Sequence, residues 1–191
     1  KRASGWADET VLTGSEMGLS VTVGSNKVYT FPHPTKPNEY YLIENRRATG
    51  RDSQLPDSGI AIWHVDEYGS NDNQQMTPSL HYECTLVQAD GNWDMEYDRN
   101  YGDSTDLWGA PSYTECGPST APNTNWWAGD SSGLLVTNIS TPGTTMTFDV
   151  GAGGLDHFEC STIASPQEVN VPFPVTITAR DSGGGIADRF N

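Results

Sequence analysis

Five segments in the middle of the chain decide the fold. Residues 39–47 read EYYLIENRR and residues 58–67 read SGIAIWHVDE. A third short run, CTLVQA at 84–89, leads directly into the acidic stretches DGNWDMEYD at 90–98 and GDSTD at 102–106. The three runs are rich in the β-branched and aromatic residues that favour strands. We therefore expect three strands that hold one acidic loop.

The composition of the whole chain also indicates a β-rich fold. The 191 residues include 20 Gly and 12 Pro, which predicts many turns, and 35% of the residues are hydrophobic. A chain of this length can bury most of its apolar side chains without a metal or a disulfide. We expect a mainly β fold, with a β-sandwich-like module that carries long irregular loops and a partial immunoglobulin-like β segment at the C-terminus.

Turn residues suggest how these strands are connected. Residues 19–23 and 27–31 flank a Gly-Ser-Asn turn, and we expect them to form a hairpin. Residues 134–140 and 144–150 flank a Thr-Pro-Gly turn and are expected to form a second, closing hairpin.

A glycine-rich stretch at 151–154 predicts a boundary between a β module, residues 1–150, and a tail, residues 151–191. The tail alternates like the first strands of an immunoglobulin-like domain, but it is far shorter than the roughly 100 residues of a whole one. We therefore expect the tail to dock on the β module, to pair with another molecule, or to have been cut from a longer chain. The first residues show no secretory signal peptide, which predicts a mature product or a fragment.

The net charge narrows the range of partners. The chain carries 25 acidic and 10 basic residues, a formal net charge of −15. Such a surface repels nucleic-acid phosphates and anionic membranes, and no run approaches the roughly 20 apolar residues of a membrane span. We expect neither nucleic-acid binding nor membrane insertion. The acidity indicates either a solvated, self-repelling surface or carboxylates that bound cations neutralise.

The acidic loop after residue 89 is the strongest candidate for chemistry. Asp90, Asn92 and Asp94 follow the spacing that opens an EF-hand loop, but Met95 replaces its glycine and Tyr101 its final glutamate. Clustered carboxylates suit a hard cation, so we predict an irregular calcium site; a solvated acidic loop is the alternative. The candidate calcium ligands are Asp90, Asn92, Asp94, Asp103 and Asp106.

Zinc and catalytic chemistry find little support in the sequence. The histidines form no H-E-x-x-H pair, so no zinc is expected, and His64 is interpreted as a core or rim residue of a strand. Glu44, Arg46, Asp66 and Glu67 would meet if the two long runs pair. We interpret them as a structural Glu–Arg network or as metal ligands rather than as catalytic carboxylates, and we expect no catalytic residue. The four histidines are His33, His64, His81 and His157.

Three further patterns call for an interpretation. Cys84 and Cys116 are expected to form a disulfide that closes the acidic loop, leaving Cys160 as a free thiol. Asn138 begins an Asn-Ile-Ser sequence that fits an N-glycosylation site. Four tryptophans of the segment 90–133 are interpreted as core or loop anchors, with a sugar-stacking face as the alternative. These tryptophans are Trp93, Trp108, Trp126 and Trp127.

Several blocks, in the same order, resemble the segment that follows the catalytic core in secreted metallopeptidases of the immune inhibitor A family. That family has the pattern E-Y-[FY]-L-[IL]-E-N-R-Q, then L-P-G-x-G-[LI]-L-I-W-H-[VI]-D-E, then Q-A-D-G, G-D-x-x-D, S-G-x-x-[IV]-x-N-I-S and M-T-F-D-V. The matching residues are 39–47, 55–67, 88–91, 102–106, 132–140 and 146–150. The tail from residue 154 resembles bacterial immunoglobulin-like surface domains.

The resemblance implies a secreted, β-rich, calcium-using protein, located outside the cell or on its surface. It does not imply catalysis by this chain, because the family's zinc helix H-E-x-x-H-x-x-G-x-x-H is missing here. Asp57 replaces a glycine of the pattern, and residues 105–109 differ from the family's Pro-Phe-Pro-Gly continuation. The cysteines at 84 and 116 are peculiar to this chain.

Two hypotheses about function follow from these observations. The first is a noncatalytic, calcium-stabilised β module whose partner is the catalytic domain of a metallopeptidase-like parent. The second is a structural subunit of an extracellular or cell-surface assembly, in which identical subunits join by strand addition through residues 175–180.

Overall fold

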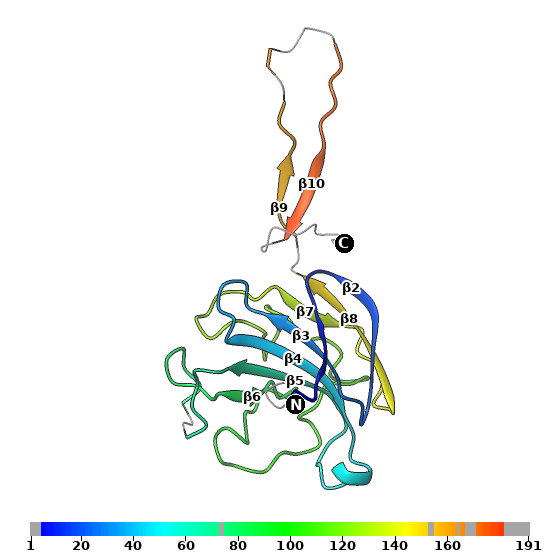
Figure 1. Cartoon of the computed structure of the whole chain (residues 1–191), viewed down its shortest axis with the longest axis vertical. Helices are drawn as coiled ribbons and strands as arrows, with labels where there is room; N and C mark the ends of the chain where they lie inside the picture. Colours follow the sequence, from blue (N-terminus) through cyan, green and yellow to red (C-terminus); the bar gives the residue numbers. More distant parts are fainter. Residues whose placement is uncertain (1–4, 73–74, 153–154, 164, 167–170, 182–191) are drawn as a thin grey trace.

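Two β-sheets stack into a sandwich, and a separate hairpin follows it (Figure 1). The computed structural model describes residues 5–72, 75–152, 155–163, 165–166 and 171–181. The larger sheet has the strand order β1-β3-β4-β5-β6 and the smaller β2-β8-β7, which confirms the predicted mainly β, sandwich-like class. The strands are β1 (Asp8–Val11), β2 (Glu16–Thr22), β3 (Lys27–Pro32), β4 (Glu39–Arg46), β5 (Gly59–Asp66), β6 (Cys84–Leu86), β7 (Leu134–Thr137), β8 (Thr145–Ala152), β9 (Leu155–Cys160) and β10 (Ile177–Asp181), and a 3-10 turn, η1, spans Gly50–Asp52.

The two long runs of the sequence form the centre of the larger sheet. β4 pairs antiparallel with β5, with Ile43 opposite Ile62 and Leu42 opposite Trp63, so the predicted pairing is confirmed. Successive side chains in a strand point to opposite faces. Ile43 and Ile62 therefore face the sandwich interior, where both are fully buried. Leu42 and Trp63 lie on the outer face, where Leu86 of β6 continues the row beside Trp63.

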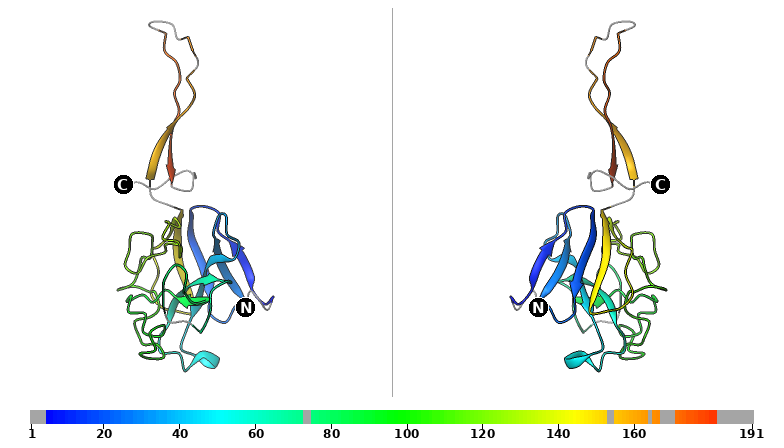
Figure 2. Two further views of the ribbon diagram at one scale, coloured as in Figure 1. Left: turned by 90° about the vertical axis from the view of Figure 1, so that its left-hand side faces the viewer. Right: turned by 90° about the vertical axis from the view of Figure 1, so that its right-hand side faces the viewer.

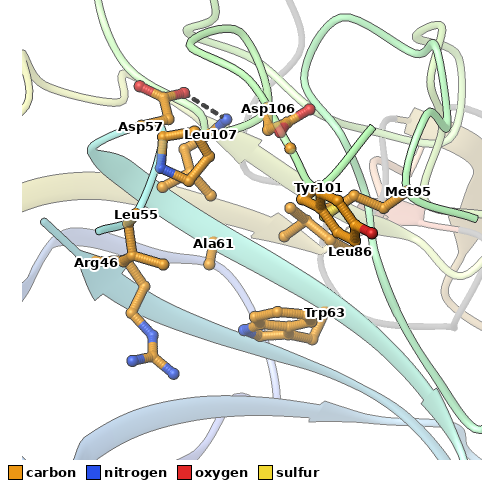
Figure 3. Close-up of a pocket in the computed structure, with 12 residues that line it drawn as sticks. Arg46, Leu55, Asp57, Ala61, Trp63, Leu86, Met95, Tyr101, Asp106 and Leu107 are labelled. Carbon is orange, nitrogen blue, oxygen red and sulfur yellow. Dashed lines mark hydrogen bonds between the residues drawn. The ribbon is translucent and has the colours of Figure 1, made fainter. Parts of the chain in front are cut away.

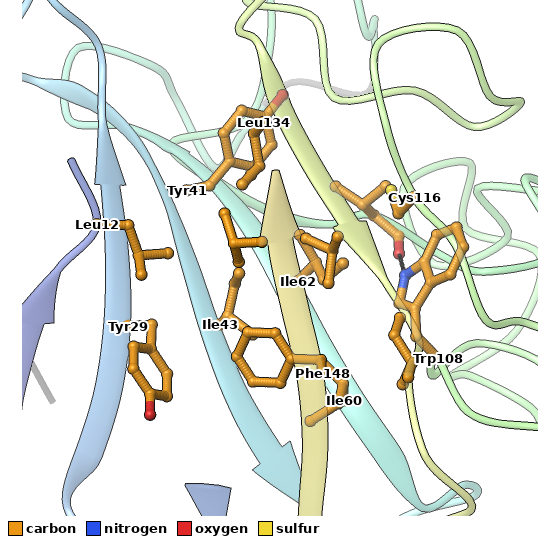
Figure 4. Packing of buried hydrophobic residues seen from close by; sticks show 14 of the residues in the cluster. Leu12, Tyr29, Tyr41, Ile43, Ile60, Ile62, Trp108, Cys116, Leu134 and Phe148 are labelled. Atoms are coloured by element: carbon orange, nitrogen blue, oxygen red, sulfur yellow. Dashed lines mark hydrogen bonds between the residues drawn. The ribbon is translucent and has the colours of Figure 1, made fainter. Parts of the chain in front are cut away.

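Aromatic and aliphatic side chains from both sheets fill the space between them (Figure 4). Tyr29 of β3 meets Phe148 of β8 edge to face, with ring centroids 5.4 Å apart, an arrangement that the ring quadrupoles favour. Leu134 of β7 is fully buried in the same cluster. Each such side chain contributes about 1.5–3 kcal/mol when it leaves water, so this core is the main source of the stability of the fold.

The hairpin expected from residues 19–23 and 27–31 is wrong. β2 pairs with β8 in the smaller sheet, whereas β3 pairs with β1 and β4 in the larger one. The intervening turn, with Gly24 at φ +74°, carries the chain from one sheet to the other. Val21 and Tyr29 are both buried in the core this way, because each strand packs against the opposite sheet. The closing hairpin is confirmed, since β7 pairs antiparallel with β8.

The long irregular segment between β6 and β7 covers one side of the sandwich. The backbone of Trp108 exchanges two hydrogen bonds with Ile60, with N–O distances of 2.8 and 2.9 Å. The backbone of Cys116 exchanges two more with Val136 of β7, at 2.9 and 2.7 Å. Figure 2 shows these green loops on the side of the sandwich away from β1 and β2. The loop region is thereby joined to β5 of the larger sheet and to β7 of the smaller sheet.

The last two strands form a hairpin beyond the end of the sandwich (Figures 1 and 2). Phe158 lies opposite Ala179 and Cys160 opposite Ile177, so these four share one face. On the other face Arg180 donates to Glu159 at 2.8 Å. Residues 151–152 of the predicted boundary form the end of β8 and residues 153–154 lie outside the described part of the chain, so the division into two domains stays a prediction.

Candidate metal centre

Three carboxylates converge where the loop after β6 meets the loop at 102–106. One carboxylate oxygen from each of Asp90, Asp103 and Asp106 lies within 4.8 Å of the others. The backbone places them there: the Ala89 N–H donates to the Asp106 carbonyl at 2.9 Å, which brings the start of one loop beside the end of the other. We call these three residues the acidic triad. Among the described residues, it is the one group of three or more acidic, His or Cys side chains close enough to hold a metal ion.

Local hydrogen bonds fix the three carboxylates. The Asp103 N–H donates to Asp106 Oδ2 at 2.6 Å, and the Thr105 N–H donates to Asp103 Oδ1 at 2.9 Å. The Thr105 hydroxyl lies 2.8 Å from Asp90 Oδ2 and 2.6 Å from Asp103 Oδ1. A hydroxyl has a single proton, so it can donate to one of these oxygens at a time. These neutral donors hold the carboxylates in place but leave the negative charge of the triad without a cation among them.

The electrostatics of the triad are unfavourable without a cation. Asp106 is 3% exposed. Burial, together with the negative charges of Asp103, Asp90 and Asp57, raises the pKa of its carboxyl to about 6. The pKa of Asp103 is lowered instead, by hydrogen bonds from the Thr105 hydroxyl and N–H. Ionising a buried carboxyl beside two like charges is energetically unfavourable. A divalent cation would stabilise the ionised form and so remove this cost.

The structure does not bring all five predicted ligands together. Asn92 donates two hydrogen bonds to the Asp90 carboxylate, from its backbone N–H at 3.0 Å and from its side-chain amide at 2.8 Å. Asp94 lies outside the triad and pairs with Arg99 at 3.4 Å. The Thr105 hydroxyl was not among the predicted ligands, although its place between Asp103 and Asp106 in GDSTD could have indicated that it belongs to the site.

An apolar pocket of about 190 Å³ adjoins the triad on the outer face of the larger sheet (Figure 3). Trp63, Leu86 and Met95 contribute to its walls, and Asp106 lies at its border. Asp57, the residue that departs from the family pattern, accepts a hydrogen bond from the Leu107 N–H at 2.8 Å. This bond ties the triad loop to the segment before β5.

The carboxylates of the two central strands do not form one cluster. Glu44 accepts a hydrogen bond from Arg46 at 2.8 Å. Asp66 and Glu67 lie at the other end of the pair, because Glu44 is opposite Ala61 in the register. The expected meeting of these four residues is therefore wrong, since the antiparallel register separates them.

Two histidines lie in an aromatic stack at the other end of the central strands. His64 and His81 stack on Trp127 with ring centroids 4.8 and 4.4 Å away. His64 Nε2 lies 3.1 Å from Glu39 Oε1, and His81 Nε2 lies 3.0 Å from Asp66 Oδ2. His64 is buried, as its interpretation as a strand residue predicted. Burial lowers its pKa, an effect that the neighbouring Glu39 opposes.

The expected Cys84–Cys116 disulfide is wrong, because both cysteines are free thiols in the structure. Cys84 pairs with Val65 in the larger sheet, whereas Cys116 bridges to Val136 of the smaller sheet. Their backbones thus belong to different layers. Burial raises the pKa of the Cys116 thiol to about 12, so it is an unreactive core side chain. Cys160 is also a free thiol.

The tryptophans and the sequon have mixed outcomes. Trp108 and Trp126 are buried in the core, as the anchoring interpretation predicted, whereas Trp93 is partly buried against it. Asn138 is exposed, but its amide donates to Asp149 Oδ2 at 2.6 Å. A glycan on this nitrogen would have to accommodate that hydrogen bond, and glycosylation of Asn138 stays a prediction.

In the part that the structure describes, no helix has the length and apolar character needed to cross a membrane. The resemblance to the immune inhibitor A family rests on the sequence motifs. No family model, no curated protein and no solved structure matches this chain.

Proposed function

We propose that this chain is a noncatalytic β module of a secreted metallopeptidase-like protein, and that Ca²⁺ bound at the acidic triad stabilises it. The observation that carries this proposal is the convergence of Asp90, Asp103 and Asp106 around a buried carboxyl. The catalytic domain of the parent is the proposed partner, outside the cell or on its surface.

The residues of the triad fit a calcium ion. Ca²⁺ binds carboxylate oxygens at about 2.3–2.6 Å, so two ligands on opposite sides of one ion lie about 4.6–5.2 Å apart. The triad oxygens all lie within 4.8 Å of one another, so they are close enough to bind one ion together. Asp90, Asp103 and Asp106 would hold the ion, and it would supply the positive charge that their oxygens lack. The site would then join two loops that the sheets alone do not connect.

A thermal melt of the 191-residue chain tests this proposal. Binding to the folded state alone adds about 2.7 kcal/mol at a calcium concentration 100 times the Kd. A domain of this size shifts by roughly 2–4 °C per kcal/mol, so the Tm should rise by about 5–11 °C from EDTA to saturating Ca²⁺. Glu115→Gln, which removes an exposed charge elsewhere, is the matched control and should keep the full rise. An identical wild-type Tm in both buffers contradicts the proposal.

The exposed hairpin favours a second function, that of a structural subunit in an assembly. Phe158 is 56% exposed and Ile177 is 63% exposed on the same face of β9 and β10. A two-stranded hairpin is marginally stable alone, so a further strand or sheet would complete it. We propose identical subunits as partners in this case. Light scattering over a concentration series should then show oligomers, and a monomer at every concentration argues against it.

A further inference from the structure

A second pocket, of about 340 Å³, lies where the loop after β6 meets residues 123–129. This volume is at the lower end of the roughly 300–1,000 Å³ typical of small-molecule sites. None of the acidic triad residues lines it, so the two sites are separate. The lining residues used below are His64, Trp93, Tyr97, Asn123, Asn125 and Trp127.

The aromatic side chains of this pocket differ in what covers their faces. Trp127 is already stacked against two rings, those of His64 and His81. Tyr97 is 45% exposed and has the Arg99 guanidinium 5.0 Å from its ring centroid, which leaves it one face at most. Trp93 has no stacked or edge-on ring among the described residues. Trp93 is only partly buried against the core and Tyr97 is exposed, so both rings keep some surface that a ligand can contact.

The backbone holds Trp93 in an uncommon conformation. Its φ is +55°, in the left-handed region that bulky residues rarely adopt. Such strain costs of order 1–3 kcal/mol and gathers at functional sites. The Trp93 carbonyl accepts a hydrogen bond from the Tyr97 N–H at 3.0 Å, so one turn presents both rings to the pocket.

Two polar atoms of the lining residues have no partner among the described residues. They are the donor Nε1 of Trp127 and the acceptor Oδ1 of Asn125, and both are buried. A buried polar atom without a hydrogen bond costs about 1–3 kcal/mol, so a ligand hydroxyl gains this energy once the side chains that cover the two atoms move aside. Asn123 adds an exposed amide to the rim.

The charge of the walls indicates which ligand fits. No carboxylate, lysine or arginine belongs to the described lining residues, and His64 is buried with a lowered pKa. A charged ligand would find no counter-ion there, and the net charge of −15 repels anions. Aromatic faces beside amides suit a neutral molecule that has one apolar face and a rim of hydroxyls.

We infer that this pocket binds one neutral pyranose ring of a sugar or glycan, with Trp93 and Tyr97 against its apolar face and Asn123, Asn125 and the Trp127 N–H beside its hydroxyls. This site goes beyond the calcium-stabilised module and does not depend on it. It also assigns to two residues of the acidic loop a role that the sequence motifs left open.

Titration of the whole chain with defined sugars tests the inference. The probes are glucose, mannose, galactose and N-acetylglucosamine, each as the monosaccharide and as its linear trimer, measured by calorimetry and by saturation-transfer NMR. At least one should bind saturably, and the monomer and trimer arms separate a free sugar from a glycan. Glucuronic acid should bind at least tenfold more weakly than the neutral monosaccharides. The inference is overturned if glucuronic acid binds as tightly as the neutral sugars, or if every neutral probe has a Kd above about 10 mM.

Variants place the binding in this pocket. Trp93→Ala should raise the Kd at least tenfold. Trp93 also packs against the core, so its loss can destabilise the fold. Tyr97→Ala removes a more exposed ring and is therefore the second variant. It should raise the Kd at least threefold and leave the Tm unchanged. Tyr68→Ala removes an 86% exposed ring outside the pocket and should leave the Kd unchanged. Equal Kd values for wild type and Tyr97→Ala contradict the proposed site.

Discussion

Replacing Asp106 by Asn should change the stability of the protein in opposite directions with and without calcium. Asp106 is buried beside two other triad carboxylates, so its charge is unfavourable unless a cation neutralises it. Asn keeps an oxygen for the Asp103 N–H, which now donates to Asp106 Oδ2 at 2.6 Å. It also offers an amide that can donate to the neighbouring carboxylates. The substitution therefore removes one charge and little else.

The size of the effect follows from the pKa of Asp106. A rise from 3.8 to about 6 corresponds to at most about 3 kcal/mol, and solvent screening at a loop reduces this to about 1–2 kcal/mol. In EDTA at pH 7.5, Asp106→Asn should therefore raise the Tm by about 2–8 °C. In saturating Ca²⁺, wild type gains about 2.7 kcal/mol and the variant little, so wild type should become the more stable protein.

Calorimetric melts of both proteins in the two buffers measure this reversal. Asp94→Asn is the control, because Asp94 lies outside the triad and pairs with Arg99; it should keep most of the calcium gain. An Asp106→Asn variant that melts below wild type in EDTA, or that gains as much from calcium, refutes the reasoning.

Three further outcomes follow from the structure. In EDTA the free energy of unfolding of wild type should fall relative to that of Asp106→Asn between about pH 4 and about pH 6. The raised pKa of Asp106 makes the folded state hold this proton more tightly than the unfolded state, and that contribution to stability is lost as the pH rises. Gly102→Ala should cost about 1–3 kcal/mol in urea melts and weaken the calcium response, because φ is +97° and the added Cβ would lie 2.9 Å from Asp106 Oδ2 and 3.0 Å from Pro56 Cγ; an unchanged midpoint contradicts this packing. Iodoacetamide should label the exposed Cys160 first, Cys84 more slowly because burial and nearby glutamates raise its pKa to about 11, and Cys116 not at all because it is fully buried; a mass difference of two hydrogens on reduction would instead indicate a disulfide.

The central strands could be predicted because their signals are local. β4 and β5 are each eight residues long and are buried along most of their length, and their β-branched and aromatic residues fit such central strands. The connection between β2 and β3 could not be predicted in this way. A short glycine turn looks the same in sequence whether its flanking strands pair with each other or enter different sheets, and only the distant partner β8 decides.

The candidate site shows the same division between local and distant information. Sequence spacing grouped Asp90 with Asp94 because they are four residues apart, but the side chain of Asp94 turns to Arg99. Asp106 joins Asp90 through a backbone hydrogen bond from Ala89. That contact depends on how the whole loop closes, and no local pattern specifies it. The cysteine pairing failed for the same reason, since the two thiols lie on different sheets.

Native mass spectrometry of the chain in calcium-containing buffer tests the central claim most directly, because it counts bound ions. We predict one Ca²⁺ on wild type and on Asp94→Asn, and none on the triple variant Asp90→Asn, Asp103→Asn, Asp106→Asn. A wild-type protein that binds no calcium, or a triple variant that binds as much as wild type, would contradict the account.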